Sequence, residues 1–125
     1  MPEPIDISPS EWQVMNVIWD RQPVTASQII KTLKTDHPWS PATVRTFLHR
    51  LVKKGALTYE TQGNRYLYRA AVSRTPAVRE ASQSFLKSVF SGQTGPLLTH
   101  FVETSRLTPE EIQTLRDLLD RKENR

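Results

Sequence analysis

The sequence predicts a mainly α-helical protein with one small β-hairpin. Helix starts are marked by capping motifs, in which a Ser or Thr is followed directly by Pro or, three residues later, by Glu or Gln. After Gly55 the hydrophobic pattern changes from the spacing of an amphipathic helix to short runs of Thr, Tyr and Leu, which are typical of strands. The helical spacing returns beyond residue 73, so the hairpin separates two helical parts.

Two short helices are expected near the N-terminus. The first begins at the capping box of residues 8–11 and ends at Pro23. The second begins at the box of residues 25–28 and ends before Pro38. Each helix carries apolar side chains on one face: Trp12, Met15, Ile18 and Trp19 in the first, and Ile29, Ile30 and Leu33 in the second.

A third helix and a hairpin follow. The helix begins at Ser40, which precedes a proline, and it stops at Gly55. Residues 57–61 and 65–69 are rich in strand formers, and Gln62-Gly63-Asn64 lies between them. This pattern predicts two antiparallel strands joined by a turn.

The remaining chain is predicted to be helical. One helix begins at Thr75, a short helical segment covers about residues 96–103, and a capping box at residues 108–111 begins the last helix. We therefore divide the chain into a first domain over residues 1–72 and a helical region over residues 73–125.

The order helix, helix, helix, hairpin is that of a winged helix-turn-helix domain. In such a domain the third helix can enter the major groove of DNA, and the hairpin is the wing. Charge agrees with this interpretation. The 125-residue chain carries a net charge of +4 and has a pI near 9.7. Between residues 31 and 69, eight Lys and Arg residues are opposed by two acidic ones, which favours a polyanionic partner, whereas residues 73–125 are nearly neutral.

The expected third helix has two different faces. Thr46 lies at the centre of a polar face, and Val44, Phe47, Leu48 and Leu51 lie on the opposite side. The polar face also contains Ala42, Thr43, His49, Arg50 and Lys53. Its short side chains lie toward the N-terminal end, where a recognition helix approaches base edges most closely. Its long cationic side chains lie toward the C-terminal end.

Individual side chains suggest individual roles. Thr can donate or accept a hydrogen bond, and its methyl group can contact a thymine methyl. Arg50 is long enough to reach a base or a phosphate, and Lys53 and Lys54 are suited to the backbone. On the wing, Arg65 can reach an adjacent phosphate or the minor groove.

Other interpretations of the same residues stay open. The polar face can be merely solvated, with the winged helix used for contacts with another protein, or the chain can coat DNA without sequence preference. An enzyme has little support, because no Ser/His/Asp set and no Gly-rich phosphate loop can be placed. We therefore predict no catalytic residue and no cofactor.

Composition excludes several classes of site. The chain has no Cys, which excludes disulfides and thiolate metal sites. The histidines, His37, His49 and His100, lie in different elements without the spacing of metal ligands, so no metal site is expected. No apolar run is long enough to cross a bilayer, so no membrane insertion is expected. The first residues lack the pattern of a secretion signal. We therefore expect a cytoplasmic protein.

Four stretches together resemble one family. They are Ile7–Met15 (ISPSEWQVM), Val17–Trp19 (VIW), Trp39–Thr46 (WSPATVRT) and Arg50–Gly55 (RLVKKG). With them the chain resembles the BlaI/MecI/CopY family of bacterial penicillinase and copper-homeostasis repressors. The similarity runs nearly from end to end and includes Phe101-Val102-Glu103.

The resemblance implies a homodimer with an N-terminal winged helix and a C-terminal helical dimerisation region. Such a dimer represses by covering promoter operators, typically inverted repeats with TACA and TGTA half-sites. By position, the resemblance implies that Thr43 and Thr46 contact the bases with Arg50 close to them. It implies that the phosphates are held by Ser40, Arg45, Lys53, Lys54 and Arg65. Related sequences often have a basic residue at the position of Ala42, which weakens the outermost base contact.

The helical region itself favours a dimer. Its apolar residues are spread over three short helices, which cannot bury them well alone. The region can fold back on the first domain or pair with a second copy, and the resemblance favours pairing. The residues expected in the dimer are Val78, Phe85, Val89, Leu97, Leu98, Phe101, Ile112, Leu115, Leu118 and Leu119.

The resemblance implies two ways of relieving repression. In the β-lactam branch of the family, a membrane sensor-protease system triggers cleavage of an Asn-Phe bond, and the matching bond here is His100–Phe101, in which the Asn is replaced. In the copper branch, a C-terminal Cys-x-Cys set binds metal, and this chain has no Cys. We therefore expect the β-lactam-resistance type, with a copper-homeostasis repressor without the Cys motif as the alternative. The regulated gene is not encoded in the chain.

Overall fold

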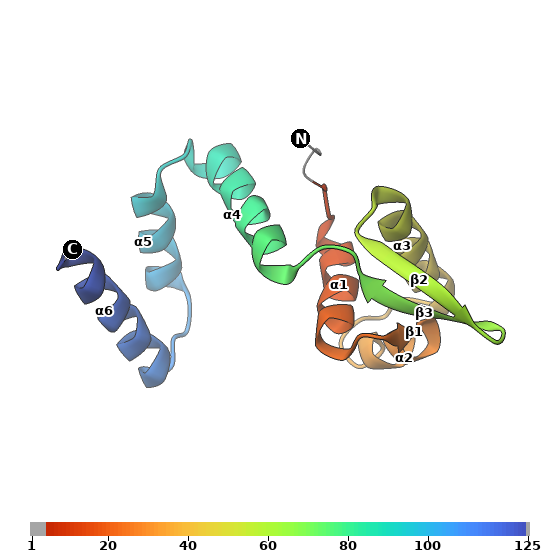
Figure 1. Ribbon diagram of the computed structural model, residues 1–125. Coiled ribbons are helices and arrows are strands. Elements are labelled where there is room, and N and C mark those ends of the chain that lie inside the picture. The colour runs from red at the N-terminus through yellow and green to blue at the C-terminus, as the bar shows by residue number, and fades with distance from the viewer. Residues whose placement is uncertain (1–4, 125) are drawn as a thin grey trace. The chain divides into compact units, whose positions relative to one another are not determined.

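The computed structural model describes residues 5–124. Residues 1–4, on which the expectation about a secretion signal partly rests, lie outside the described residues. The chain divides into two compact units, Met1–Ser82 and Gln83–Arg125. The first unit contains the three helices and the hairpin expected from the sequence (Figure 1), namely α1 (Pro9–Arg21), α2 (Ala26–Leu33), α3 (Pro41–Lys54), β2 (Leu57–Gln62) and β3 (Arg65–Ala70).

Capping side chains begin the helices where the sequence indicates. Ser8 and Glu11 form a reciprocal capping box at the start of α1, and Thr25 and Gln28 form one at the start of α2. Each box satisfies backbone N–H groups that a helix N-terminus otherwise leaves without partners. The predicted starts of these helices are therefore confirmed.

The sheet has one strand more than expected. β1 (Val24–Thr25) pairs with β3, and β3 pairs with β2, so the sheet is antiparallel with the order β1-β3-β2. The pairing of Val24 with Tyr68 joins residues that are far apart in the sequence. β1 was not expected, because two residues are too short to establish a strand period. At the hairpin turn Gly63 has φ 66°, a left-handed conformation that favours glycine.

The core of the first unit lies among α1, α2, α3 and the sheet. Its buried apolar residues are Ile7, Val14, Met15, Ile18, Val24, Ile29, Leu33, Val44, Leu48, Leu51, Ala56, Leu57 and Tyr68. Full burial of a Val, Leu, Ile or Met side chain stabilises a fold by about 1.5–3 kcal/mol. This shared core holds α3 in place and leaves the opposite face of α3 free.

The remaining helices bury much less. They are α4 (Arg74–Phe90), α5 (Thr94–Thr104) and α6 (Pro109–Glu123), and none of their residues is buried in the described chain. The division between the two units falls within α4, after Ser82. The first turn of α4 stays with the first unit because Arg74 contacts α1. The boundary at residues 72 and 73 that we draw from the sequence remains a prediction.

Along the part of the chain that the structure describes, every helix is too short or too polar to cross a bilayer.

Candidate nucleic-acid interface

Helix α3 presents the two faces that the sequence predicts. Val44, Leu48 and Leu51 are buried, and Phe47 is half-buried. On the other side Ala42, Thr46, His49, Arg50 and Lys53 are exposed, and Thr43 is half-exposed. The helix is closed at its C-terminal end by Gly55, whose φ of 86° is left-handed. The core packing therefore orients the polar face outward as a unit.

Hydroxyl groups at the start of α3 are held by local hydrogen bonds. Ser40 Oγ accepts from the Thr43 amide at 3.1 Å and lies 2.9 Å from Thr43 Oγ1. Thr46 Oγ1 donates to the Ala42 carbonyl at 3.0 Å. Because its proton is used within the helix, Thr46 offers a partner its methyl group and the free lone pair of its oxygen. These bonds give the short side chains a defined orientation before any partner binds.

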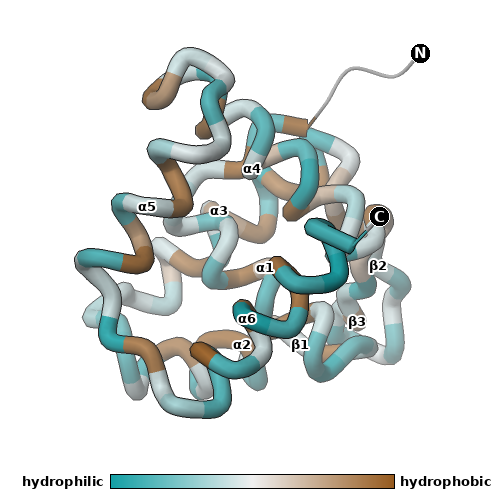
Figure 2. Tube along the Cα trace, turned by 90° about the vertical axis from the view of Figure 1, so that its left-hand side faces the viewer, coloured by the Kyte–Doolittle hydropathy of each residue, from teal (hydrophilic) through white to brown (hydrophobic). Residues whose placement is uncertain are grey.

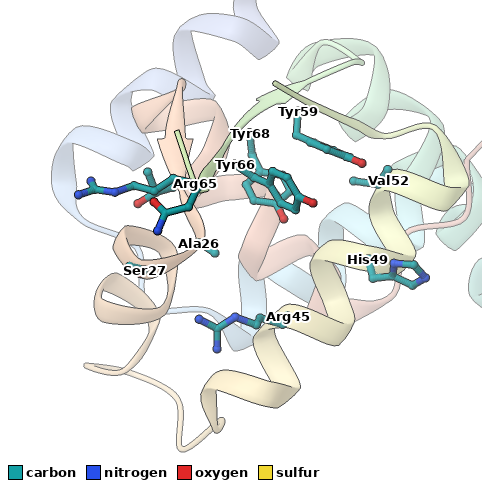
Figure 3. A pocket seen from close by; sticks show the side chains of 11 residues that line it. Ala26, Ser27, Arg45, His49, Val52, Tyr59, Arg65, Tyr66 and Tyr68 are labelled. Atoms are coloured by element: carbon teal, nitrogen blue, oxygen red, sulfur yellow. The ribbon is translucent and has the colours of Figure 1, made fainter. Parts of the chain in front are cut away.

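A cleft of about 540 Å³ lies between α3 and the wing. Figure 3 shows its walls, with Arg45 and His49 projecting from α3 and the tyrosine rings on the opposite side. The full lining is Thr25, Ala26, Ser27, Arg45, His49, Val52, Tyr59, Asn64, Arg65, Tyr66 and Tyr68. None of these residues is acidic, so the cleft suits an anionic group.

Three tyrosines form the sheet side of this cleft. The ring centroids of Tyr59 and Tyr66 are 4.5 Å apart, and those of Tyr59 and Tyr68 are 5.9 Å apart. Burial raises the pKa of the Tyr68 phenol, and the neighbouring Tyr66 and Tyr59 raise it further, although Arg45 acts in the opposite direction. The Tyr68 phenol therefore stays protonated at neutral pH and can act as a hydrogen-bond donor.

A second hollow of about 390 Å³ lies between α2 and the start of α3. Arg45 and Ser27 line both this hollow and the cleft, and Lys31 and Lys34 extend the lining along α2. Arg45 and Arg65 have no ion-pair partner among residues 5–124. The two hollows together make a basic surface on both sides of Arg45.

Sequence reasoning missed several members of this surface. They are Thr25, Ser27, Tyr59, Asn64, Tyr66 and Tyr68. Lys31 and Lys34 belong to the basic segment that the sequence indicates, but their place beside the start of α3 was not predicted. A signal was present for the tyrosines, because Tyr66 and Tyr68 alternate along one strand and Tyr59 lies opposite Tyr68 in the antiparallel register. No comparable signal existed for Thr25 and Ser27, whose place beside α3 depends on the tertiary fold.

Lys54 lies in a different setting from the other cations of α3. Its Nζ is 2.5 Å from Glu11 Oε1 and 2.6 Å from the Asp6 carbonyl oxygen. Glu11 is only 1% exposed, and its carboxylate also accepts from the Ser8 amide. Lys54 therefore joins the end of α3 to the start of α1, whereas no ion pair is found for Lys53 among residues 5–124. A role for Lys54 at a phosphate would compete with this tie.

Many large apolar residues of the last three helices are exposed. Val78, Phe85, Val89, Leu98, Phe101, Ile112, Leu115, Leu118 and Leu119 are between 37% and 60% exposed, and Leu97 is half-buried. Apolar segments recur along α4 and α5 among polar ones (Figure 2). Large apolar side chains exposed in such number are unusual for a surface that faces only water.

His100 and Phe101, which form the candidate cleavage bond, lie within α5. Both are exposed, and their ring centroids are 5.5 Å apart. A protease would need α5 to unwind locally before this bond could enter an extended active site. In residues 5–124 we find no group of three or more His, Asp or Glu side chains that could hold a metal ion.

Comparison with known proteins agrees with this geometry. The family model described as penicillinase repressor matches residues 7–121. The chain belongs to the penicillinase repressor family. Membership confirms the resemblance drawn from the four motifs, and because the members of this family are repressors, it also confirms that the chain is not an enzyme.

Relatives in this family match along nearly their whole length. The penicillinase repressor of Bacillus licheniformis is 34% identical over 95% of this chain and 93% of its own. The methicillin resistance regulatory protein MecI of Mammaliicoccus sciuri is 34% identical over 94% of this chain and 95% of its own.

A solved relative confirms the winged-helix fold. The Bacillus licheniformis BlaI monomeric form, in complex with the blaP half-operator, aligns with a TM-score of 0.53 at 36% identity. The alignment covers 60% of this chain and 92% of that chain. The family and this fold make the chain a winged-helix DNA-binding repressor.

Proposed function

We propose that this chain is a homodimeric transcriptional repressor that covers a palindromic promoter operator with TACA and TGTA half-sites. We propose further that it is of the β-lactam-resistance type and that repression ends when the dimer is inactivated. One observation carries the proposal. The exposed polar face of α3 stands next to a cleft that contains two arginines and no acidic residue.

Base reading is assigned to the middle of α3. Thr43 and Thr46 are short enough to let the helix approach base edges, and the Thr46 methyl group is free to contact a thymine methyl. Arg50 lies one turn farther along the exposed side and can reach a guanine edge or a phosphate. The Ala42 side chain cannot hydrogen-bond, so it weakens the outermost base contact to an apolar one.

Phosphate binding is assigned to the cations around this face. Arg45, Lys53 and Arg65 are exposed, and Ser40 adds a hydroxyl group at the N-terminus of α3. Lys31 and Lys34 continue the basic surface along α2. Lys54 keeps its ion pair with Glu11 and contributes to DNA binding by holding the orientation of α3. The relative solved with a half-operator supports DNA as the partner.

Pairing of two copies is supported by the exposed apolar residues of α4, α5 and α6. A second copy would cover these side chains with an identical set, as two-fold dimers commonly do. Two winged helices related in this way would read half-sites about 34–36 Å apart, one turn of DNA. If the region instead folded back on the first unit, the chain would stay monomeric and would lose this palindromic reading.

Relief of repression is assigned to the same helices. A membrane sensor-protease system is the proposed partner, and His100–Phe101 is the proposed target bond. Its cleavage would separate α6, and with it Leu115 and Leu118, from the rest of the apolar surface. The chain has no Cys, so the metal-binding switch of copper repressors has no ligands here.

Fluorescence anisotropy tests the proposal. The purified chain is titrated at about 150 mM salt into a duplex with TACA and TGTA inverted half-sites and into a scrambled duplex of equal composition. We expect a preference of about 10³ or more for the operator duplex. Equal weak binding to both duplexes would reject the operator, and it would favour a protein that coats DNA. No binding to either would favour a winged helix that contacts another protein.

A further inference from the structure

We infer that Trp19, Asp20 and Arg74 form a clamp that sets the direction of α4 and thereby determines which half-site spacing the dimer accepts. The inference rests on the proposed dimeric repressor. It concerns residues far along the chain from Thr43 and Thr46, in a part of the fold to which no DNA contact is assigned.

Several contacts converge on the residues that begin α4. The Arg74 guanidinium lies 2.7 Å from Asp20 Oδ1, and it donates to the Asn16 carbonyl at 3.2 Å. The same guanidinium lies over the Trp19 ring at 5.3 Å from its centroid. Trp19 Nε1 donates to the Val72 carbonyl at 2.9 Å. Hydrogen bonds to side chain and backbone, an ion pair and a cation–π contact thus act on one short segment.

No buried apolar contact holds α4 in this place. None of its residues is buried, and Val78, one turn after Arg74, is 45% exposed. Burial is what usually fixes a helix against its neighbours. Without it, the first turn of α4 depends on the clamp for its place against α1.

The other side of the clamp is rigid. Trp19 and Asp20 lie on α1, whose residues Met15 and Ile18 are fully buried. They share one core with Val44 and Leu48 of α3. Closely packed cores deform little, so α1 and α3 keep a constant geometry. The clamp therefore connects the orientation of the recognition helix to that of α4.

In a dimer, the orientation of α4 affects the separation of the two half-sites that the recognition helices can reach. α4 carries Phe85 and Val89, two of the residues proposed to pair with the second copy. If the first turn of α4 is fixed, both recognition helices are held ready for one half-site separation. If it is loose, the dimer can reach several separations, but each binding event must first order the segment. The clamp residues act as positioning residues and need not touch DNA.

A spacer series tests the inference. Palindromic duplexes with spacers that differ by single base pairs, and a duplex with one half-site, are bound by full-length wild type, Asp20→Asn, Arg74→Gln and the double variant. Arg79→Gln and Asp36→Asn are charge-matched controls, because both residues are exposed and have no side-chain partner among those we describe.

We expect wild type to have a sharp optimum. Each clamp variant should lose about tenfold at that optimum, the size expected if binding must order roughly one more residue in the whole dimer. The variants should lose less at other spacings, so the profile becomes broader. Arg74→Gln should lose more than Asp20→Asn, because it also removes the cation–π contact and the hydrogen bond to the Asn16 carbonyl, and the double variant should resemble Arg74→Gln. Half-site binding, which also reports correct folding, should change less than about twofold.

Each other outcome has a definite meaning. Clamp variants that keep the wild-type profile would overturn the inference and leave the proposed function intact. A wild type without any spacing preference would reject the dimeric operator, and the inference with it. Hydrogen exchange supplies a readout without DNA: the amides of residues 77–79 should exchange faster in Arg74→Gln than in Arg79→Gln. Equal exchange in both variants would also overturn the clamp.

Discussion

Lys54 and Glu11 form an ion pair that joins the last residue of α3 to the first turn of α1. The Lys54 ammonium lies 2.5 Å from Glu11 Oε1, and the Glu11 side chain is 2% exposed while that of Lys54 is 34% exposed. The same carboxylate accepts the Ser8 amide of the α1 capping box. The pair therefore connects a helix start to the orientation of the proposed DNA-reading helix.

Loss of Lys54 should destabilise the fold. In Lys54→Ala the buried Glu11 carboxylate keeps its charge but loses its cationic partner, at a cost of about 1–3 kcal/mol. Urea denaturation measures the free energy of unfolding. Lys53→Ala is the matched control and should stay within about 0.5 kcal/mol of wild type, because Lys53 is exposed. Equal stability of the two variants would contradict the structural role of Lys54.

The same pair should make stability depend on pH. Burial raises the pKa of Glu11, but the hydrogen bonds from Lys54 and Ser8 and the Lys54 charge outweigh it, so the pKa lies below its ordinary 4.5. The ionised carboxylate thus stabilises the folded state above about pH 4.5, and this contribution is lost as the pH falls through the lowered pKa.

The Glu11→Gln variant isolates this contribution. Its unfolding free energy should differ from wild type at about pH 7, and the difference should shrink as the pH falls through the lowered pKa of Glu11. Urea denaturation at a series of pH values measures it. A difference that stays constant over the whole range would assign the effect to packing alone.

Replacing Arg50 and replacing Lys53 should weaken DNA binding in different ways. Arg50→Ala should cost about 1–3 kcal/mol on the operator duplex and much less on scrambled DNA, if Arg50 reads a base. Lys53→Ala should weaken both complexes about equally and reduce the steepness of log K against log salt by about 2 for a dimer, about 1 per protomer. Anisotropy titrations at several salt concentrations measure both effects. Arg106→Ala, outside the first unit, is the control and should change neither.

Charge placed on the apolar face of α6 should separate the dimer. Leu115→Asp and Leu118→Asp would bury a carboxylate without a partner, which pairing cannot tolerate. Sedimentation velocity should give about twice the 14.4 kDa chain mass for wild type and the monomer mass for these variants. Gln113→Asp, on the opposite face of α6, should remain dimeric. A wild type that sediments as a monomer would contradict the dimer itself.

Much of the fold could be predicted from patterns among residues that are close together in the sequence. Capping boxes involve residues three positions apart, and both Ser8–Glu11 and Thr25–Gln28 form as expected. The period of apolar residues likewise assigns Val44 and Leu51 to the core side of α3. Turn chemistry at Gly63 joins two strands that alternation had already indicated. All of these depend on neighbours in the sequence, so no knowledge of the tertiary fold was needed.

The candidate site was predicted less completely. The exposed face around Thr46 follows from the helix period, and Arg65 follows from the wing. The contributions of Ser27 and Lys34 did not follow, because the hollow that they line exists only where α2 meets α3. We predict that Lys54 binds phosphate, but the structure shows a competing partner for it, Glu11, which is 43 residues away in the sequence.

The order of elements, the polar face of α3 and the family could therefore be predicted without a structure, since each rests on short-range spacing or on matching residues. Tertiary structure decided which side chains act together. The pairing of Val24 with Tyr68, the tie between Lys54 and Glu11, and the contact of Arg74 with Asp20 each join residues more than forty positions apart. Such contacts depend on loop closure and on a shared core, and neither leaves a local pattern in the chain.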